Sequence, residues 1–480
     1  MWRKVSLRIG VILSVSLAFG VAGCTPKKPD TGLGYHKDKC SVLYAGLKNV
    51  ECGTMVVEET RGANNGRTVA LPIVISHATA TDKKPDPVIV LHGGPGGGMV
   101  GFLNFALRKA DRVSPDRDWI FLDQRGTGQS SPSFDCGDAP LSDAGITSDA
   151  GVKILSDCMA KYQAAGYDLT QYNSATIAKD IRDLRTALHI TTYNLYGASY
   201  GTRVAMAVMQ HDPEGLRAVV LSSTWPPDAN ATAPLPGLVS RETRQVLSYC
   251  EADAACKAKY PGMEKRLDAL MTTWLKTPAV SNGKSYTADL LAAFLLDEIY
   301  SRDGAQSLPH TLDTILAGDY SPLDKFDKTQ AGYTEGQFFT TLCNEEFSFE
   351  NPADLDKIDA RDPIQVATAR DTRRFFAVCK SFNPGKPDPV ENEPLTSAIP
   401  TLMLSADIDA GCPAELSDEA VKRLSHGKNF FFPNRTHTIA GSDCAKKMMQ
   451  QFIETADPNV DATCIQTDQP KFLFKLDGKS

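Results

Sequence analysis

The sequence predicts an α/β fold in which a mostly parallel sheet is interrupted by a long helical insertion. Short, continuous apolar runs recur along the chain, and such runs are typical of strands that a parallel sheet buries on both faces. They lie at residues 88–91, 119–122, 193–196, 218–221, 401–404 and 430–432. Between two of them, residues 175–189 carry apolar side chains at helical spacing, and strands that alternate with helices indicate an α/β sheet.

Two regions depart from this alternation. In residues 53–78, two runs rich in β-branched residues flank a turn with Asn65-Gly66, which predicts an antiparallel hairpin at the start of the fold. After about residue 225 the strand runs stop, and segments 261–275 and 288–300 have amphipathic helical patterns. We therefore expect a core in two parts, at 40–225 and 400–480, separated by a largely helical cap at 226–399.

The composition places the chain among soluble globular proteins. Its 480 residues are 42% hydrophobic and 23% charged, which excludes a disordered protein, a collagen-like fibre and a polytopic membrane protein. Its formal net charge of −7 provides no basic field, so we expect no nucleic-acid partner.

The N-terminus has the features of an export signal. A basic start is followed by an apolar stretch from Ile9 to Ala22, which is too short for a stable membrane span. The stretch ends in small residues before Cys24, like the lipobox of bacterial lipoproteins; the alternative is an ordinary secretory signal with an incidental cysteine. We expect a signal peptide at 1–23, a lipid on Cys24 as the only membrane attachment, and a flexible tether at 24–39.

This resemblance predicts an exported, membrane-anchored bacterial lipoprotein. Thr25 follows the lipidated position, where an aspartate would signal retention at the inner membrane. In a host with two membranes, we therefore expect the protein at the periplasmic face of the outer membrane.

The twelve cysteines fit an exported protein, because thiols outside the cytoplasm tend to pair as disulfides. Cysteine spacing does not indicate a structural zinc site, and we expect no metal. Local spacing suggests the pairs Cys40–Cys52, Cys136–Cys158, Cys250–Cys256, Cys343–Cys379 and Cys444–Cys464, with Cys412 left over.

A candidate nucleophile lies between a predicted strand and a predicted helix. Residues 197–201 read Gly-Ala-Ser-Tyr-Gly, and this strand–turn–helix context is the one a G-x-S-x-G nucleophile elbow requires. The turn exposes the Ser199 hydroxyl, and the following helix directs amide N–H groups, beginning with that of Tyr200, toward developing negative charge.

A serine nucleophile needs a histidine base that is oriented by a carboxylate. In this fold the acid and then the histidine follow the serine along the chain. His437 comes just after the last strand run, whereas His310 lies in the insertion and His426 in a turn before a strand. Asp407 and Asp409 both follow the strand run 401–404, and spacing alone does not choose between them.

A glycine-rich loop follows the strand run 88–91. Residues 92–98 read His-Gly-Gly-Pro-Gly-Gly-Gly, and glycines let backbone N–H groups approach a ligand closely. The loop lacks the Lys-Ser/Thr ending of a phosphate-binding P-loop. We therefore expect it to supply the second oxyanion donor, near Gly94.

These motifs together resemble the proline iminopeptidase and tripeptidyl aminopeptidase family of serine exopeptidases, which have the α/β-hydrolase fold. The resemblance covers most of the chain from Cys40 to Cys464. It implies Ser199, Asp409 and His437 as the catalytic triad, and no organic cofactor. The motifs that carry it are HGGPGGG, DQRGTGQS, LYGASYGTRVA, IPTLMLSADIDAGCP and HTIAGSDC.

The chain departs from the family pattern around the acid and the histidine. Ala406-Asp407 replaces Gly-Glu, residues 410–412 read Ala-Gly-Cys instead of Pro-Val-Thr, and HTIAG replaces Gly-His-Gly. These changes spare the triad and alter the residues expected at the rim of the pocket.

The resemblance also suggests roles outside the triad. Glu345 and Glu346 fall on a segment similar to one in the tripeptidyl aminopeptidase branch, and in related exopeptidases cap carboxylates bind the substrate's free amine. The alternative is that they are two solvated helix charges. Asp123 and Arg125 fall on a motif that we interpret as structural, holding the loop near the oxyanion site.

The sequence therefore predicts a lipid-anchored serine peptidase that removes residues or short peptides from the N-termini of peptide substrates. An esterase or lipase-like hydrolase with the same triad is the main alternative, because the triad does not distinguish amides from esters. A catalytically silent binding lipoprotein of the same fold is a second alternative.

Overall fold

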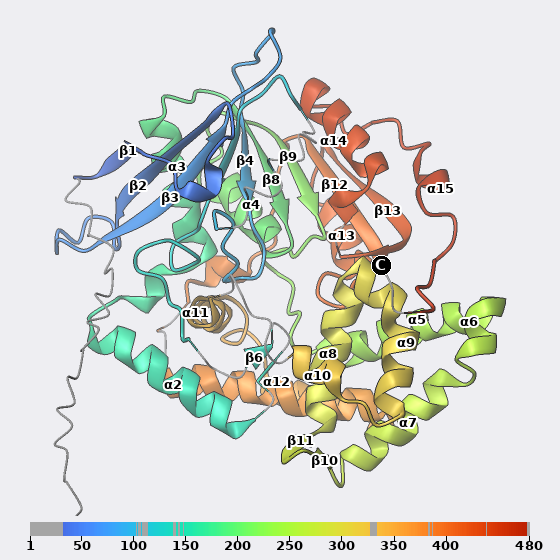
Figure 1. Ribbon diagram of the computed structural model, residues 1–480. Coiled ribbons are helices and arrows are strands. Elements are labelled where there is room, and N and C mark those ends of the chain that lie inside the picture. Colours follow the sequence, from blue (N-terminus) through green and yellow to red (C-terminus); the bar gives the residue numbers. More distant parts are fainter. Residues whose placement is uncertain are drawn as a thin grey trace, which may run out of the picture. The chain divides into compact units, whose positions relative to one another are not determined.

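The structure is a computed structural model. It describes residues 32–477 except 102, 104–106, 108–113, 138–140, 143, 144, 147, 327–333, 383, 384, 386 and 438. The expected signal peptide and Cys24 lie outside the described residues. The helices and strands reported below all belong to the unit Leu33–Ser480 (Figure 1).

Within the described residues, nine strands form one sheet in the order β1-β2-β3-β5-β4-β8-β9-β12-β13. The pairs from β4–β5 to β12–β13 are parallel, and the pairs from β1–β2 to β3–β5 are antiparallel. The expected mostly parallel sheet is thus confirmed. The strands are β1 (Gly34–Asp38), β2 (Val50–Glu58), β3 (Thr68–Ser76), β4 (Val88–Leu91), β5 (Trp119–Leu122), β8 (Tyr193–Ala198), β9 (Leu216–Ser222), β12 (Thr401–Ile408) and β13 (Gly427–Thr436).

The predicted hairpin is present, because β2 pairs with β3 in the register Val50↔Ser76 to Glu58↔Thr68. The expected tether at 24–39 needs a correction, since residues 34–38 form the edge strand β1, antiparallel to β2. The Tyr35 ring lies where a side chain on Gly53 would stand, so this glycine lets β1 close over β2. A shortened protein that lacks the expected signal peptide and lipid anchor should therefore still include residues 34–38.

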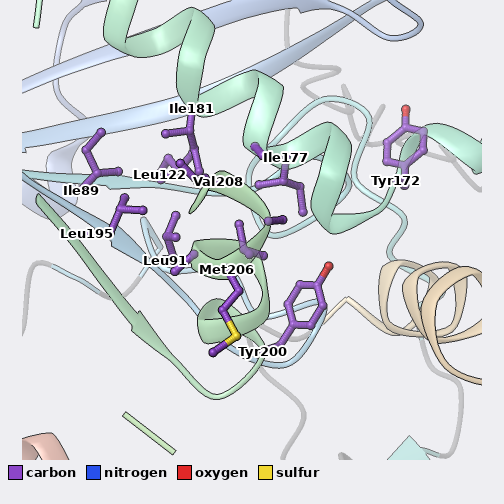
Figure 2. Close-up of a cluster of buried hydrophobic side chains, with 14 of the residues drawn as sticks. Ile89, Leu91, Leu122, Tyr172, Ile177, Ile181, Leu195, Tyr200, Met206 and Val208 are labelled. Atoms are coloured by element: carbon purple, nitrogen blue, oxygen red, sulfur yellow. The ribbon is translucent and has the colours of Figure 1, made fainter. Parts of the chain in front are cut away.

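Both faces of the sheet are buried. Successive residues of a strand point to opposite faces, so Val219 of β9 packs with the helices α3 (Ser174–Ala187) and α4 (Tyr200–His211). Val220 packs on the other face, against α14 (Asp443–Thr455). Figure 2 shows the first of these layers, in which Ile89, Leu91 and Leu195 meet side chains from α3 and α4.

The segment 226–399 holds helices and one two-stranded hairpin, β10 (Ala279–Ser281) with β11 (Lys284–Tyr286). Its first part has a hydrophobic cluster of its own, formed mainly by α5, α7, α8 and α9. Its helices are α5 (Leu235–Ala252), α6 (Ala254–Lys259), α7 (Met263–Trp274), α8 (Ala288–Tyr300), α9 (Arg302–Leu316), α10 (Ser321–Phe326), α11 (Glu335–Glu345) and α12 (Pro363–Phe382).

The later part of this segment packs differently from the expected separate cap. Phe339 and Leu342 of α11, and Phe375 of α12, belong to the same cluster as the sheet and α4.

The remaining elements are α2 (Asp149–Ala164), α13 (Ala414–Val421), α15 (Ile465–Asp468), the short strands β6 (Leu141–Ser142) and β7 (Gly145–Ile146), and the 3-10 helices η1 (Val42–Tyr44), η2 (Leu169–Gln171), η3 (Pro352–Lys357), η4 (Pro389–Asn392) and η5 (Ile439–Gly441).

All five suggested cysteine pairs are disulfides in the described part of the chain, and Cys412 is a buried free thiol. None of the helices in the described ranges combines the length and the apolar character that crossing a membrane requires.

Candidate active site

Ser199 occupies the turn between β8 and α4. Its backbone has φ 56° and ψ −128°, a conformation that a non-glycine residue rarely adopts. The turn is tight, because a Cβ on Gly201 would come within 2.1 Å of the Leu91 carbonyl oxygen and one on Gly197 within 2.4 Å of the Gly201 oxygen. These two glycines allow the turn, which is the predicted nucleophile elbow.

His437 and Asp409 follow two neighbouring parallel strands. Asp409 comes directly after β12 and His437 directly after β13. The His437 Nδ1 atom lies 2.8 Å and 2.9 Å from the two carboxylate oxygens of Asp409, which is itself buried. This contact fixes the ring and places the donor hydrogen on Nδ1.

The structure settles which aspartate serves the histidine. Asp407 points away from His437 and accepts hydrogen bonds from the Tyr249 hydroxyl (2.9 Å) and the Arg435 backbone N–H (3.0 Å). Asp409 is therefore the carboxylate that orients His437, in agreement with the resemblance, and Asp407 ties α5 to β13.

The glycine-rich loop lies against the nucleophile. A Cβ on Gly93 would come within 2.8 Å of the Ser199 Cβ atom, so only glycine allows this approach. Gly93 and Gly94 both line the same cavity as Ser199, and Tyr200 is the first residue of α4. The glycine-rich loop and the N-terminus of α4 thus lie on either side of Ser199, as an oxyanion hole requires. That the Gly94 and Tyr200 N–H groups are the donors remains a prediction.

The structural interpretation is confirmed for Asp123, and Arg125 is structural as well but does not bond to the loop. Asp123 accepts backbone hydrogen bonds from Met99 (2.5 Å) and Val100 (2.8 Å), just beyond the glycines. Arg125 is fully buried and pairs with Asp180 at 2.7 Å. Neither residue lines the cavity: Asp123 holds the end of the glycine-rich loop, whereas Arg125 ties its own segment to α3 and to the Glu59 and Gln171 carbonyls.

Ser199 and His437 open into a common cavity of about 530 Å³ between the sheet and the cap helices. Its volume is in the range of small-molecule and short-peptide sites. Apart from the loop and the triad, its wall is mainly apolar and aromatic. The side chains that form this part of the wall include Trp225, Leu235, Leu296, Tyr300, Phe338, Leu342 and Phe375.

Asp297 is the only carboxylate among the described residues that line this cavity. In the described part of the chain it has no hydrogen-bond or ion-pair partner. Burial raises the pKa of the Asp297 carboxyl above its ordinary value. The sequence carries a signal for it, because Asp297 and Glu298 interrupt the otherwise apolar pattern of α8.

The expected amine-binding role of Glu345 and Glu346 needs a correction. Both side chains are 1% exposed and pair with the buried Arg203 of α4, and neither lines the cavity. The alternative of solvated helix charges is wrong for the same reason. Arg203 lies on α4, four residues after Ser199. Its side chain points inward, beneath the nucleophile elbow, and reaches the two glutamates at the end of α11.

Two further residues near the triad escaped the sequence analysis. The Tyr300 ring lies 4.6 Å from the His437 ring, centroid to centroid. The Tyr300 hydroxyl fills the space that a Cβ atom on residue 411 would need, so this position requires glycine. This contact explains the glycine at a position where the family pattern differs. Cys412 donates its backbone N–H to Asp409 Oδ1 (2.9 Å), and its thiol contacts the Ser199 side chain.

Two family models match the chain: the alpha/beta hydrolase fold over residues 86–247 and a TAP-like protein domain over residues 365–464. A proline iminopeptidase of Xylella fastidiosa strain Temecula1 is 32% identical over 28% of this chain and 31% of its own length. A tripeptidyl aminopeptidase of Streptomyces lividans is 24% identical over 40% of this chain and 39% of its own length.

Serine protease Hip1 of Mycobacterium tuberculosis is 25% identical over 42% of this chain and 39% of its own length. The matches thus cover between about a third and two fifths of these relatives. A crystal structure of a Mycobacterium smegmatis proline iminopeptidase is 15% identical, with a TM-score of 0.40 over 84% of this chain and 98% of that chain. From the sheet, the elbow and the sequence matches, we conclude that this chain has the α/β-hydrolase fold and is similar, over part of its length, to peptidases of the proline iminopeptidase and tripeptidyl aminopeptidase type.

Proposed function

We propose that the protein is a serine peptidase that cleaves short peptides near a free N-terminus. His437 accepts the hydroxyl proton of Ser199 as Ser199 Oγ attacks the scissile carbonyl carbon. The backbone N–H groups near Gly94 and Tyr200 stabilise the oxyanion, and His437 then gives the proton to the leaving amine. Water hydrolyses the resulting acyl-enzyme by the same steps, and the cycle requires no cofactor.

The observation that carries the preference for N-termini is the position of Asp297. An unpaired carboxylate on an apolar wall attracts a cation strongly, because little water screens the interaction. The α-ammonium group of a peptide is a cation that enters such a cavity attached to apolar side chains. A simple ester or an N-blocked peptide offers Asp297 no positive charge.

We expect Asp297→Asn to raise KM for peptides with a free N-terminus by about 10- to 150-fold. This range corresponds to about 1.5–3 kcal/mol for a hydrogen bond to a charged group. Hydrolysis of a simple ester should be nearly unchanged, and kcat for the peptides should fall less than KM rises. Steady-state kinetics on matched free and N-acetylated peptides would measure both effects.

Glu298→Gln is the matched control, because Glu298 is the adjacent carboxylate on α8 and does not line the cavity. It should leave KM close to that of the unmodified protein. An equal loss on free peptides and on esters in Asp297→Asn would mean that Asp297 shapes the cavity without binding an amine.

The direct test of the proposed function uses the full chain, with Ser199→Ala as control. Matched peptides, free or acetylated at the N-terminus, would be incubated with each protein, and mass spectrometry would identify the products. Serine-dependent loss of N-terminal residues from the free peptides alone supports the proposal. Serine-dependent ester hydrolysis without peptide cleavage would favour the esterase alternative, and no reaction with a fluorophosphonate probe would favour the silent binding protein.

We also propose that the chain is exported and anchored by a lipid on Cys24. The lipobox-like sequence before Cys24 supports this proposal, and so do the five disulfides, because such bonds persist outside the cytoplasm. In cells fed a labelled fatty acid, the unmodified chain should carry the label in the membrane fraction, whereas Cys24→Ala should lose the label. A labelled Cys24→Ala protein would refute lipidation at this cysteine.

A further inference from the structure

The free thiol of Cys412 lies next to the predicted catalytic triad. Donor atoms of Asp409, Cys412 and His437 all lie within 4.8 Å of one another, and they form the one such grouping of three potential metal ligands in the described part of the chain. Cys412 also contacts the Ser199 side chain, so the thiol stands among all three members of the triad. The mechanism proposed above assigns no task to this sulfur.

We propose that Cys412 and His437 form an inhibitory site for thiophilic divalent cations such as Zn²⁺ and Cd²⁺. Cysteine sulfur and imidazole nitrogen are the ligands that zinc prefers, and a tetrahedral zinc ion holds its ligands about 3.3–3.8 Å apart. One ring nitrogen of His437 lies within 4.8 Å of the Cys412 sulfur, so side-chain rotation has to bring the two ligand atoms about 1 Å closer. Two oxygen ligands, from the Ser199 hydroxyl and water or from two water molecules, complete the four-coordinate site.

Asp409 would orient His437 as a metal ligand without binding the metal itself. A metal-binding histidine usually donates its other ring N–H to a carboxylate, which fixes the ring orientation and raises the basicity of the binding nitrogen. His437 already donates from Nδ1 to Asp409 at 2.8 Å, which leaves Nε2 for the metal. The contact that prepares His437 as a base therefore also prepares it as a ligand.

Binding would stop catalysis for a direct chemical reason. The Cys412 thiol gives its proton to solvent and forms a metal–sulfur bond, while the Nε2 lone pair forms a metal–nitrogen bond. That lone pair is then unable to accept the Ser199 proton, so the serine stays inactive. Mg²⁺ and Ca²⁺ prefer oxygen ligands and should not compete.

The surroundings of the site allow access and limit competition. Cys412 and His437 both line the cavity, so an ion that enters with solvent reaches them. The other cysteines of the described part of the chain are bonded in disulfides and offer no thiolate. No lysine or arginine is found among the described residues that line the cavity, so no fixed cation repels the metal there.

The test titrates Zn²⁺ and Cd²⁺ into the full chain during hydrolysis of a simple ester, which makes it independent of the preference for N-termini. We expect loss of activity that a chelator reverses. In Cys412→Ser, normalised to its own metal-free rate, the half-inhibitory concentration should rise about 100-fold, since even outer-shell changes cost about 10- to 100-fold in metal affinity. Cys412→Thr provides a second variant should the serine form fold poorly.

A binding measurement needs no activity. Cd²⁺ should produce one equivalent of the ultraviolet cadmium–thiolate absorption in the unmodified chain and in Ser199→Ala, and none in Cys412→Ser. His426→Ala, which removes an exposed imidazole from the surface, should leave both the absorption and the inhibition unchanged. Equal inhibition of the unmodified chain and of Cys412→Ser, or no thiolate absorption in the unmodified chain, would overturn the proposal.

Discussion

Ser199→Ala should lower kcat by about a millionfold, and Asp409→Asn by about ten-thousandfold. The serine forms the covalent intermediate, so its loss leaves only binding and oxyanion stabilisation. The asparagine keeps the shape of Asp409 but can present an N–H group to His437 Nδ1, which favours the tautomer that is unable to accept the serine proton. Steady-state hydrolysis of an activated ester, together with fluorophosphonate labelling, would measure both losses.

The matched control for the acid is Asp407→Asn. Asp407 lies two residues from Asp409 but bonds to Tyr249 and to the Arg435 backbone. Its replacement should change stability more than kcat. Comparable losses of kcat at both positions would show that the histidine draws on a different carboxylate from the one the geometry assigns.

Arg203→Met should destabilise the fold by about 3–5 kcal/mol, the typical cost of removing one partner from a buried ion pair. Arg203 is 1% exposed, and its Nε atom lies 3.0 Å from Glu345 Oε2, while Nη1 contacts Glu346. Without the guanidinium group, two buried carboxylates face each other with no cation. Denaturant unfolding, followed by circular dichroism, would give the difference in the free energy of unfolding.

Two variants make this result specific. Adding Glu345→Gln and Glu346→Gln to Arg203→Met should recover much of the loss, because the buried charges are then gone. Arg361→Ala, which removes an exposed pair with Asp359, should leave the free energy of unfolding unchanged. A loss in Arg203→Met that the glutamines do not reduce would assign the effect to packing of the arginine stem.

The sequence predicts the sheet well because its buried strands are continuous apolar runs, each of which the structure shows as a strand. It also predicts Ser199 and His437, since a short local motif or a strand end marks each of them. It does not choose between Asp407 and Asp409 from spacing, because the turn after β12 decides which carboxylate faces the histidine.

The errors share a physical cause. The acidic pair at 345–346 looks like a surface feature of α11, but it is buried against Arg203 of α4 and accepts further hydrogen bonds from Tyr200 and from the Ala231 backbone. The strand at 34–38 has the polar composition of a tether because it is an edge strand, of which one side faces solvent. In both cases a partner outside the segment determines the structure: the neighbouring strand β2 for β1, and Arg203 on a helix far away in sequence for the acidic pair.

The attachment of α11 has a consequence for how the protein turns over substrate. The Thr334 N–H bonds to the Gly96 carbonyl at 2.9 Å, and a disulfide links Cys343 of α11 to Cys379 of α12. This side of the cavity is thus tied to the loop that carries the reaction. On the other side, α5 and α7–α9 share a hydrophobic cluster that also takes in Ile364 and Ala367 of α12 and Ile408 and Ala410 on either side of Asp409. The two sides of the cavity are therefore joined through α12, and we expect changes in that cluster to alter the surroundings of Asp409 and His437 together with the rate of product release.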